Sequence, residues 1–284
     1  MSWLRSLLIL GRVSNLPTVW SNCLAGWWLG GGGNLEKFPF LFIGTTLLYI
    51  GGMFLNDAFD ATFDQQHRRE RPIPSGAIER NTVWKLGFVW LGLGELSLLW
   101  LGPVSAATGV ALALCILVYN AVHKLFTLSP VLMGACRFLV YVLAASTGVF
   151  GITGRALWSG VALGVYVVGL SGLARKESSR GPTPRWPVVL LSAPILLALL
   201  MNPADYREPA LLVSLVLALW VVRCLRTAFW TTDVNVGRTV SGLLAGIVFV
   251  DWLAVAPEIS RTSSVGFLLL FLAALLTQRL APAS

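Results

Sequence analysis

Apolar segments of membrane-spanning length recur along the whole chain, and they limit its possible folds more than any other feature. A helix needs about 20 mostly apolar residues to cross a bilayer. Ten segments approach this length, the seventh being the shortest: 14–31, 38–57, 82–101, 103–121, 130–150, 157–175, 187–202, 209–230, 236–255 and 263–281. No stretch between them resembles a soluble domain or a long linker. We therefore predict an all-α protein, a polytopic membrane helical bundle that forms one integral membrane domain over residues 1–284.

The composition supports a membrane protein and excludes several other classes. Hydrophobic residues make up 56% of the chain and charged residues only 12%, whereas soluble domains carry about 25% charged residues. The net charge of +8 is not arranged as a basic face with interleaved aromatic residues, so nucleic-acid binding is not expected. The four cysteines are scattered singly and only two histidines are present. This argues against a disulfide framework or a zinc site.

The lysines and arginines predict how the bundle is oriented. With the N-terminus in the cytoplasm, sixteen of the 21 basic residues fall on the cytoplasmic side and Arg137 lies within a span. The four on the far side are Lys37, Arg155, Arg207 and Arg261. This is the bias of the positive-inside rule. We expect an integral protein of a bacterial inner (plasma) membrane, with its N-terminus and its active site on the cytoplasmic side.

The stretch NDAFDATFDQQHRRERPIPSG crowds acids and then bases where the second apolar segment leaves the membrane. Helical spacing places four oxygen-bearing side chains within an arc of about 100°: Asn56, Asp57, Asp60 and Asp64. Mg²⁺ relieves the repulsion between such carboxylates, and it binds one or two of them together with substrate phosphate oxygens. Arg68 and Arg71 follow with guanidinium groups suited to phosphate, and Pro72 and Pro74 are expected to end the helix. The alternative is a solvated cytoplasmic loop whose acids and bases pair among themselves.

The motif N-D-x-x-D-x-x-x-D followed by R-P-I-P-S-G resembles the first aspartate motif of the UbiA superfamily of intramembrane prenyltransferases. The opening R-V-S-N-L-P-T-V-W-S-N-C-L-A-G (12–26) is similar to that family's first helix. Tyr119-Asn120-x-x-His123-Lys124 and Met133-Gly134-x-x-Arg137 look like its fourth and fifth. The resemblance implies a helical bundle around a central cavity open to the cytoplasmic side. The family commonly has nine spans, so either 187–202 does not span or this chain carries a tenth.

The second aspartate motif of the family has no counterpart here. Its position reads Y-V-V-G-L-S-G-L-A-R-K-E-S-S-R, residues 166–180, without an aspartate. Tyr166 and Glu177 fall within about 20° on one helical face, so Glu177 is a candidate for the remaining carboxylate. Arg175 and Lys176 are candidates to neutralise diphosphate where the family would use a second metal. The alternative is a basic loop with one paired glutamate. The A-R-K-E replacement resembles the EboC-like branch of the family, found in small-molecule biosynthetic clusters.

Several polar side chains inside the other spans are expected either to line the substrate site or to form interhelical hydrogen bonds. They group by span as Arg12, Asn15 and Asn22, then Tyr119, Asn120, His123 and Lys124, then Arg137 and Tyr141. Glu95 and Asp251 are also acids within spans. We expect both of these to pair structurally with a basic or polar neighbour.

By this resemblance, the expected function is Mg²⁺-dependent transfer of a prenyl group from an isoprenyl or polyprenyl diphosphate to a hydrophobic acceptor. We expect this acceptor to be aromatic. The Mg²⁺ ligands would be Asn56, Asp57, Asp60 and Asp64 with Glu177, and the diphosphate would be neutralised by Arg68, Arg71, Lys124 and Arg175 or Lys176. Tyr141 and Tyr166 would shelter the allylic cation with their aromatic faces. The isoprenoid tail would lie toward membrane lipid, and no protein partner is inferable. Two alternatives remain, a membrane terpene cyclase on the same fold and a non-catalytic isoprenoid-lipid carrier.

Overall fold

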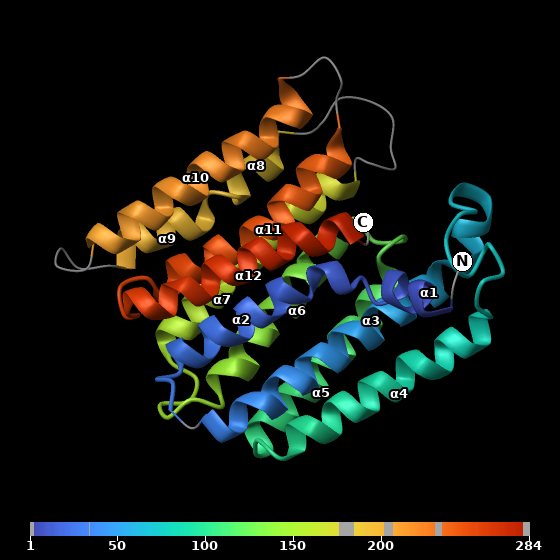
Figure 1. Cartoon of the computed structure of the whole chain (residues 1–284), viewed down its shortest axis with the longest axis horizontal. Helices are drawn as coiled ribbons and strands as arrows, with labels where there is room; N and C mark the ends of the chain where they lie inside the picture. The colour runs from blue at the N-terminus through green and yellow to red at the C-terminus, as the bar shows by residue number, and fades with distance from the viewer. Residues whose placement is uncertain (1–2, 34, 176–184, 202–206, 231–234, 281–284) are drawn as a thin grey trace.

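The structure is a computed structural model that describes residues 3–33, 35–175, 185–201, 207–230 and 235–280. Every regular element among these residues is helical, and α1 and the end of α12 lie toward the same end of the bundle (Figure 1). In chain order the elements are α1 (Trp3–Leu10), η1 (Val13–Asn15), α2 (Leu16–Leu29), η2 (Leu35–Lys37), α3 (Phe38–His67), α4 (Arg80–Leu99), α5 (Pro103–Val122), α6 (Ser129–Ala145), α7 (Gly154–Ala174), α8 (Trp186–Leu190), α9 (Ala193–Met201), α10 (Arg207–Phe229), α11 (Val236–Val255) and α12 (Arg261–Leu280).

Each of the ten predicted apolar segments contains helix, but the helices differ in length. Seven in the described ranges are long and apolar enough to cross a membrane, namely α3, α4, α5, α7, α10, α11 and α12. The α2 helix has 14 residues and α6 has 17. The segment 187–202 is divided into α8 and α9 by a turn at Leu191 and Ser192. The all-α membrane bundle is therefore confirmed, whereas nine or ten spans stays a prediction.

Glycines bring α3 and α4 into close backbone contact. A Cβ at Gly51 would lie 2.8 Å from the carbonyl oxygen of Gly87, and one at Gly94 would lie 2.9 Å from that of Gly44. The two glycines of each helix are seven residues apart, so they lie on the same face. Small residues at helix contacts let backbones approach in a membrane, where apolar surface alone gives little driving force. This contact fixes the direction in which α3 leaves the bundle.

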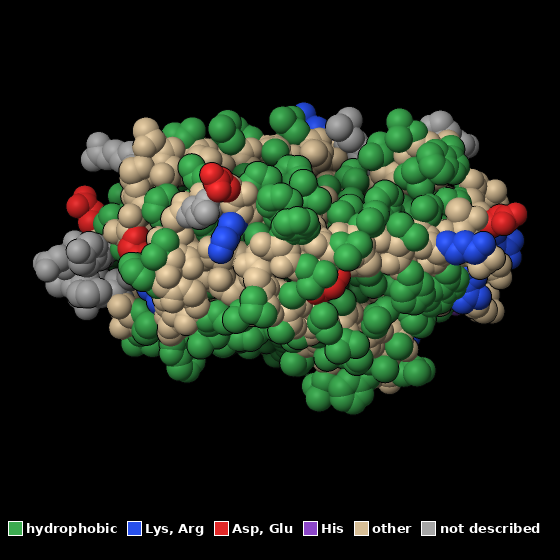
Figure 2. Space-filling model, turned by 90° about the horizontal axis from the view of Figure 1, so that it is seen from below, with side chains coloured by type: hydrophobic (Ala, Val, Ile, Leu, Met, Phe, Trp, Pro, Cys, Tyr) green, Lys and Arg blue, Asp and Glu red, His purple; other side chains and the backbone are tan. Residues whose placement is uncertain are grey.

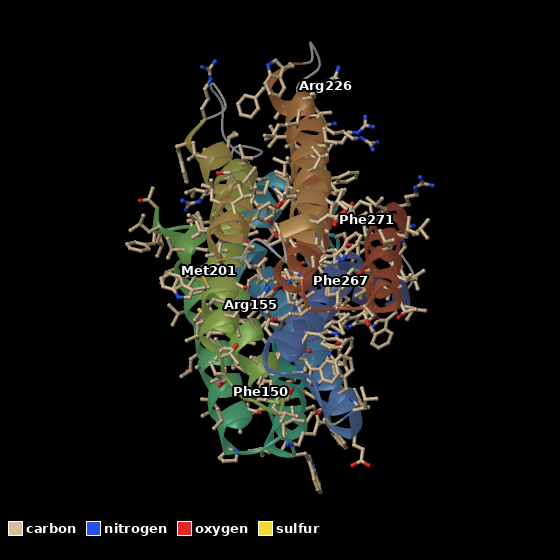
Figure 3. The ribbon with its side chains drawn as sticks, turned by 90° about the vertical axis from the view of Figure 1, so that its left-hand side faces the viewer. Phe150, Arg155, Met201, Arg226, Phe267 and Phe271 are labelled. Carbon is tan, nitrogen blue, oxygen red and sulfur yellow. The ribbon has the colours of Figure 1, made fainter. Side chains whose placement is uncertain are left out.

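The interior has two main apolar clusters with α2 and α6 between them. One cluster joins α2 through α6 and includes Leu48, Leu98 and Leu143. The other joins α2 and α6 with the helices from α7 to α12 and includes Leu163 and Ile247. Figure 3 shows the same division from the left-hand side of Figure 1, with α4 and α5 below and α10 above.

The outer surface of the bundle is largely hydrophobic. In Figure 2 hydrophobic side chains cover most of the visible face, and most of the Lys and Arg side chains seen there lie near one end. Many large apolar side chains are exposed, including Trp100, Leu125 and Leu200. Exposure on this scale is unusual for a soluble monomer and is typical of a surface that faces lipid.

The α3 helix is longer than the apolar segment that predicts it. The segment ends at residue 57, but the helix continues to His67, so the aspartate motif lies on its last turns. It ends before Pro72, and the backbone N–H of Arg68 closes it by donating to Asp64 O at 2.8 Å. The prediction that Pro72 and Pro74 end the helix is thus wrong by several residues. The prolines lie instead in the turns that lead to α4.

Candidate functional site

The predicted aspartate face lies buried on the last turns of α3. Its four members, which we call the aspartate cluster, are Asn56, Asp57, Asp60 and Asp64, each no more than 9% exposed. A buried carboxylate needs a cation or hydrogen-bond donors nearby, because burial disfavours its charged form. The structure provides cations from three other segments of the chain.

Arg71 bridges two carboxylates of the cluster. Its Nη1 lies 3.3 Å from Asp57 Oδ1 and 2.9 Å from Asp64 Oδ2. Arg71 reaches them because the turns after α3 fold back, and Arg80 anchors the returning chain by donating from Nε to Ala58 O at 2.9 Å. Arg68, also a predicted phosphate ligand, is half-buried at the end of α3. This part of the motif therefore pairs within itself, as the alternative interpretation of the sequence expects.

Arg12 approaches the same carboxylates from the connection between α1 and α2. Its Nη2 donates to Asn56 Oδ1 at 3.2 Å and lies 3.5 Å from Asp57 Oδ1. Burial lowers the pKa of Arg12, but the attraction of Asp57 and other groups more than offsets this and raises it above the ordinary value. Arg12 also has φ 41°, the only positive φ of a non-glycine residue in the described ranges. Such a conformation costs about 1–3 kcal/mol and persists where surrounding contacts hold it.

The end of α5 and the residues just after it also contact the cluster. Lys124 Nζ lies 2.7 Å from Asp60 Oδ1, and His123 Nε2 lies 3.3 Å from the same oxygen. Asn120 accepts from Asn56 Nδ2 at 3.1 Å and donates to Gly52 O at 3.0 Å, so it fixes α5 against α3.

Two aromatic rings frame this contact. Tyr119 stacks on His123 with ring centroids 5.1 Å apart. Lys124 Nζ lies 3.9 Å from the centre of the Phe63 ring, a cation–π contact. Phe63 is not among the residues predicted from the sequence to form the site. The signal was its place on α3, three residues after Asp60.

Arg175 lies near this corner but faces the backbone. Its guanidinium donates to the carbonyl oxygens of His123 at 3.1 Å and Phe126 at 2.9 Å, and also to that of Thr127. The prediction that Arg175 neutralises diphosphate does not match this geometry, because these carbonyls occupy its donors. Arg175 holds the chain just after α5 in place. The predicted partners Lys176 and Glu177 lie outside the described residues.

A second buried polar network, which we call the Asp251 network, joins α2, α6 and α11. Asp251 accepts from Asn22 Nδ2 at 2.7 and 2.9 Å, from Tyr141 Oη at 2.6 Å, and from the Ser21 hydroxyl. Asn22 in turn accepts from Arg137 Nη1 at 2.6 Å. The structural pairing expected for Asp251 is confirmed. Arg137 and Asn22 therefore make the interhelical hydrogen bonds that were one of their two predicted roles.

The two predicted cation-sheltering tyrosines have no exposed ring face. Tyr141 and Tyr166 are both 0% exposed. Tyr141 belongs to the Asp251 network, and Tyr166 donates to Leu243 O of α11 at 2.9 Å. Tight packing of both rings contradicts the prediction that they shelter a cation in this structure.

Asn15 is buried at the start of α2.

Glu95 departs from the pairing that was expected of it. Both carboxyl oxygens are buried without a hydrogen-bond partner in the part of the chain that the structure describes, and a Cβ at Gly109 of α5 would lie 2.5 Å from Glu95 Oε2. The carboxyl therefore packs against α5 without a hydrogen-bond partner among the described residues, so its predicted pairing is not found there.

The aspartate cluster fits Mg²⁺ in one particular mode. No group of three or more His, Cys, Asp or Glu side chains in the described part of the chain is placed to hold a metal by itself. Arg71 contacts Asp57 and Asp64, whereas Asp60 faces Lys124. Mg²⁺, however, commonly binds one or two carboxylates and completes its shell with substrate phosphates and water. The cluster offers these oxygens, and the cations around it suit the phosphates.

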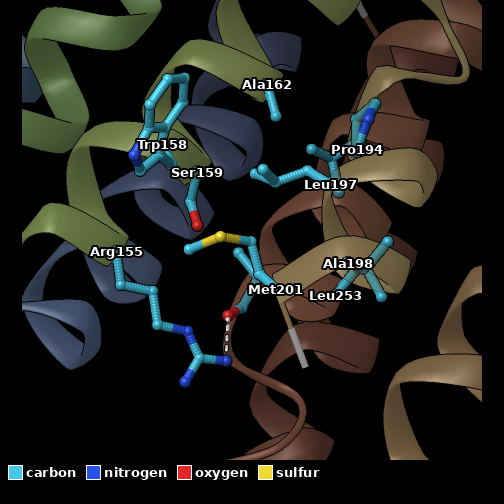
Figure 4. A pocket seen from close by; sticks show the side chains of 11 residues that line it. Arg155, Trp158, Ser159, Ala162, Pro194, Leu197, Ala198, Met201 and Leu253 are labelled. Atoms are coloured by element: carbon cyan, nitrogen blue, oxygen red, sulfur yellow. Dashed lines mark hydrogen bonds between the residues drawn. The ribbon is translucent and has the colours of Figure 1, made fainter. Parts of the chain in front are cut away.

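A pocket between α7, α9 and α11 lies away from this cluster (Figure 4). Arg155, Trp158 and Met201 are among its lining residues, and its volume is about 30 Å³. A single water needs at least about 10–15 Å³ by this kind of measure, so the pocket has room for very few waters. It is too small to hold an isoprenoid chain.

Known proteins share both the sequence pattern and the fold. Digeranylgeranylglyceryl phosphate synthase of Ignicoccus hospitalis is 31% identical over 157 residues, which are 55% of this chain and 50% of that protein. The enzyme of the same name from Sulfolobus acidocaldarius is 30% identical over 123 residues, 43% of this chain and 41% of that one. The chain thus aligns with half or less of the length of these curated relatives.

Solved structures match over nearly the whole chain. One of a digeranylgeranylglyceryl phosphate synthase in membranes has a TM-score of 0.62 at 17% identity, covering 96% of this chain and 99% of that one. A UbiA homologue from Archaeoglobus fulgidus bound to GPP and Mg²⁺ has a TM-score of 0.51 at 12% identity, covering 96% and 98%. At these identities the likeness establishes the fold. The sequence model of the UbiA prenyltransferase family matches residues 15–233, and the chain belongs to that family.

Proposed function

We propose that this protein transfers a prenyl group from an isoprenyl diphosphate to a hydrophobic acceptor, with Mg²⁺ bound at the aspartate cluster. The observation that carries this proposal is the facing arrangement of charges at one end of α3. Three buried carboxylates on a single helix meet Arg12, Arg71 and Lys124, which come from three other parts of the chain. Family membership and the names of the relatives support the same reaction.

The charges explain why metal and diphosphate would bind together. Three carboxylates and three cations leave the cluster close to neutral. Mg²⁺ alone would add uncompensated positive charge there, and diphosphate alone would add uncompensated negative charge. Mg²⁺ offsets most of the charge of a diphosphate, so the pair adds little net charge. The carboxylates would turn to the metal, and the cations they release would turn to the phosphate oxygens.

Each residue then has a defined part in the reaction. One or two carboxylates of the aspartate cluster, from among Asp57, Asp60 and Asp64, would hold Mg²⁺, which when bound stabilises negative charge on the leaving diphosphate. Arg71 and Lys124 would donate to the diphosphate oxygens as the allylic C–O bond breaks and its electron pair leaves with the diphosphate. A nucleophilic atom of the acceptor would bond to the allylic carbon and lose one proton.

The placement of the site and the acceptor class are also part of the proposal. The positive-inside bias supports a cytoplasmic site, in a plasma membrane that we expect to be bacterial although the matched relatives include archaeal proteins. An aromatic acceptor, as expected from the sequence, is the first candidate. The names of the relatives favour a second, a prenylated glyceryl phosphate lipid.

The test is diphosphate release by the purified protein from geranyl, farnesyl and geranylgeranyl diphosphate, with and without Mg²⁺. Each donor is assayed with and without a membrane extract as the source of acceptor. We expect release that requires Mg²⁺ and the extract and is lost in Asp57→Asn. The control is Glu79→Gln, which removes an exposed carboxylate at the start of α4. Release without the extract would indicate cyclisation, and binding without any release would indicate a carrier; both would overturn the proposal.

A further inference from the structure

A second strongly charged feature lies on helices that carry no part of the aspartate cluster. A groove of about 440 Å³ is lined by the end of α10, the start of α11 and the end of α12. Three arginines line it, Arg223 and Arg226 from α10 and Arg238 from α11. Neither the aspartate cluster nor the Asp251 network contributes a lining residue.

These arginines are exposed and lack acidic partners within the described ranges. The ion pairs found there involve other basic residues, namely Arg12, Arg71, His123, Lys124 and Arg155. Arg223 lies over the ring of Trp220, 5.1 Å from its centre. Three guanidinium groups around one concave surface repel one another unless an anion lies between them. Planar guanidinium forks match phosphate oxygens especially well.

Two large apolar side chains, Trp220 and Leu275, line the groove, and we call them its floor. Trp220 donates from Nε1 to Gly242 O at 2.8 Å, and its ring packs edge-on against Phe271 with centroids 4.9 Å apart. Leu275 of α12 completes this floor. A free phosphate or a soluble anion gains nothing from such a surface, whereas the glycerol and chain region of a lipid buries apolar area against it.

The groove also continues into surface that faces lipid. Leu219 and Val222 precede Arg223 and Arg226 by four residues, so they lie one helical turn deeper on the same faces, and both are exposed. Exposed Leu272 lies about one turn before Leu275 on α12. A molecule with its head among the arginines would therefore have its chains along an apolar track toward the membrane interior.

We propose that this groove binds an anionic phospholipid, with the phosphate held by Arg223, Arg226 and Arg238 and the chains against Trp220 and Leu275. Arginines of two consecutive helices would share one phosphate, which would hold the end of α10 to the start of α11. The site is independent of the prenyl-transfer proposal.

Native mass spectrometry of the detergent-purified full chain tests this, with phosphatidic acid and phosphatidylcholine as probes. We expect one saturable phosphatidic acid per chain and much weaker retention of phosphatidylcholine. The double variant Arg226→Gln/Arg238→Gln should weaken phosphatidic acid binding about tenfold or more, since hydrogen bonds to charged groups are strong. The matched control Arg5→Gln/Lys85→Gln removes the same charge from exposed positions on α1 and α4 and should bind as the unmodified protein does.

Two further readouts separate a built site from general charge attraction. Phosphatidic acid with brominated chains should quench tryptophan fluorescence, and Trp220→Phe should remove part of that quenching while the lipid still binds. Inorganic phosphate at millimolar concentration should not displace the lipid. Equal weakening in the two double variants, displacement by inorganic phosphate, or quenching unchanged in Trp220→Phe would each overturn the proposal.

Discussion

Asp57 and Asp251 are both buried carboxylates within the helical bundle, but their partners differ. Asp57 is faced by the cations Arg12 and Arg71, which reach it from connections outside the helices. Asp251 accepts hydrogen bonds from the Ser21 hydroxyl, the Asn22 amide and Tyr141, all on helices in the interior.

This difference separates a site that can exchange partners from one that cannot. Long cationic side chains on connecting segments can turn from a carboxylate to a phosphate when a metal takes their place. Short neutral donors on packed helices cannot move without breaking the packing around them. We therefore assign binding chemistry to the aspartate cluster and helix positioning to the Asp251 network.

The largest effect should come from removing Asp251. Asp251→Ala leaves three buried donors without their acceptor, so we expect a loss of about 3–5 kcal/mol in unfolding free energy, at about 1–3 kcal/mol for each unsatisfied group. Thermal or denaturant unfolding in detergent measures this. Ser21→Ala removes a single hydrogen bond and should cost only about 1 kcal/mol. If Asp251→Ala has the unfolding free energy of the unmodified protein, the Asp251 network does not position helices, and it no longer differs in role from the aspartate cluster.

Asp57→Asn should have the reverse profile, with activity lost and stability kept. Loss of one preorganised group at a reacting centre lowers kcat about 10²–10³-fold, and Arg71 keeps its 2.9 Å partner Asp64. Diphosphate release and the unfolding midpoint are measured on the same preparation. An unfolding midpoint that falls as far as that of Asp251→Ala would mean that the aspartate cluster is structural.

Lys124→Gln should reduce kcat/KM for the diphosphate donor about tenfold to a hundredfold. The variant removes one charge-assisted hydrogen bond to the leaving group, and such bonds contribute about 1.5–3 kcal/mol. Lys124→Arg keeps the charge and should recover part of the activity. Equal activity in the Gln and Arg variants would show that Lys124 serves only Asp60.

The smallest effect should come from Arg175→Gln, at about threefold to tenfold in kcat/KM, because Arg175 acts through the chain that carries Lys124. A double-mutant cycle with Lys124→Gln distinguishes positioning from direct contact. If Arg175 positions Lys124, the double variant is no worse than Lys124→Gln alone. Independent, additive losses would restore the sequence-based expectation that Arg175 contacts diphosphate.

The sequence predicts the helices and the aspartate face well, because both depend on local spacing. The apolar runs mark the helices, and the i, i+3, i+7 spacing of Asp57, Asp60 and Asp64 stays on one helical face because α3 extends past its apolar segment. The same spacing cannot show that Arg71 folds back onto Asp57, which depends on the turns after α3.

Long-range partners explain where the sequence-based predictions fail. Asn22 and Asp251 meet across 229 residues of chain, so neither residue reveals the other. Tyr166 belongs to a helix that is apolar on most sides, and only the packing of α7 against α11 shows that its hydroxyl reaches Leu243. Arg175 was assigned by analogy with a second metal site, but the carbonyls after α5 occupy it.

The most direct test of the central claim is a calorimetric titration of Mg²⁺ into the purified protein, with and without geranyl thiodiphosphate as an unreactive donor. If the aspartate cluster exchanges its cations for the pair, each ligand should raise the affinity of the other at least about tenfold. Asp60→Asn should remove that coupling, and Glu79→Gln should preserve it. Equal Mg²⁺ affinity with and without the donor analogue, or coupling that survives in Asp60→Asn, would contradict the account.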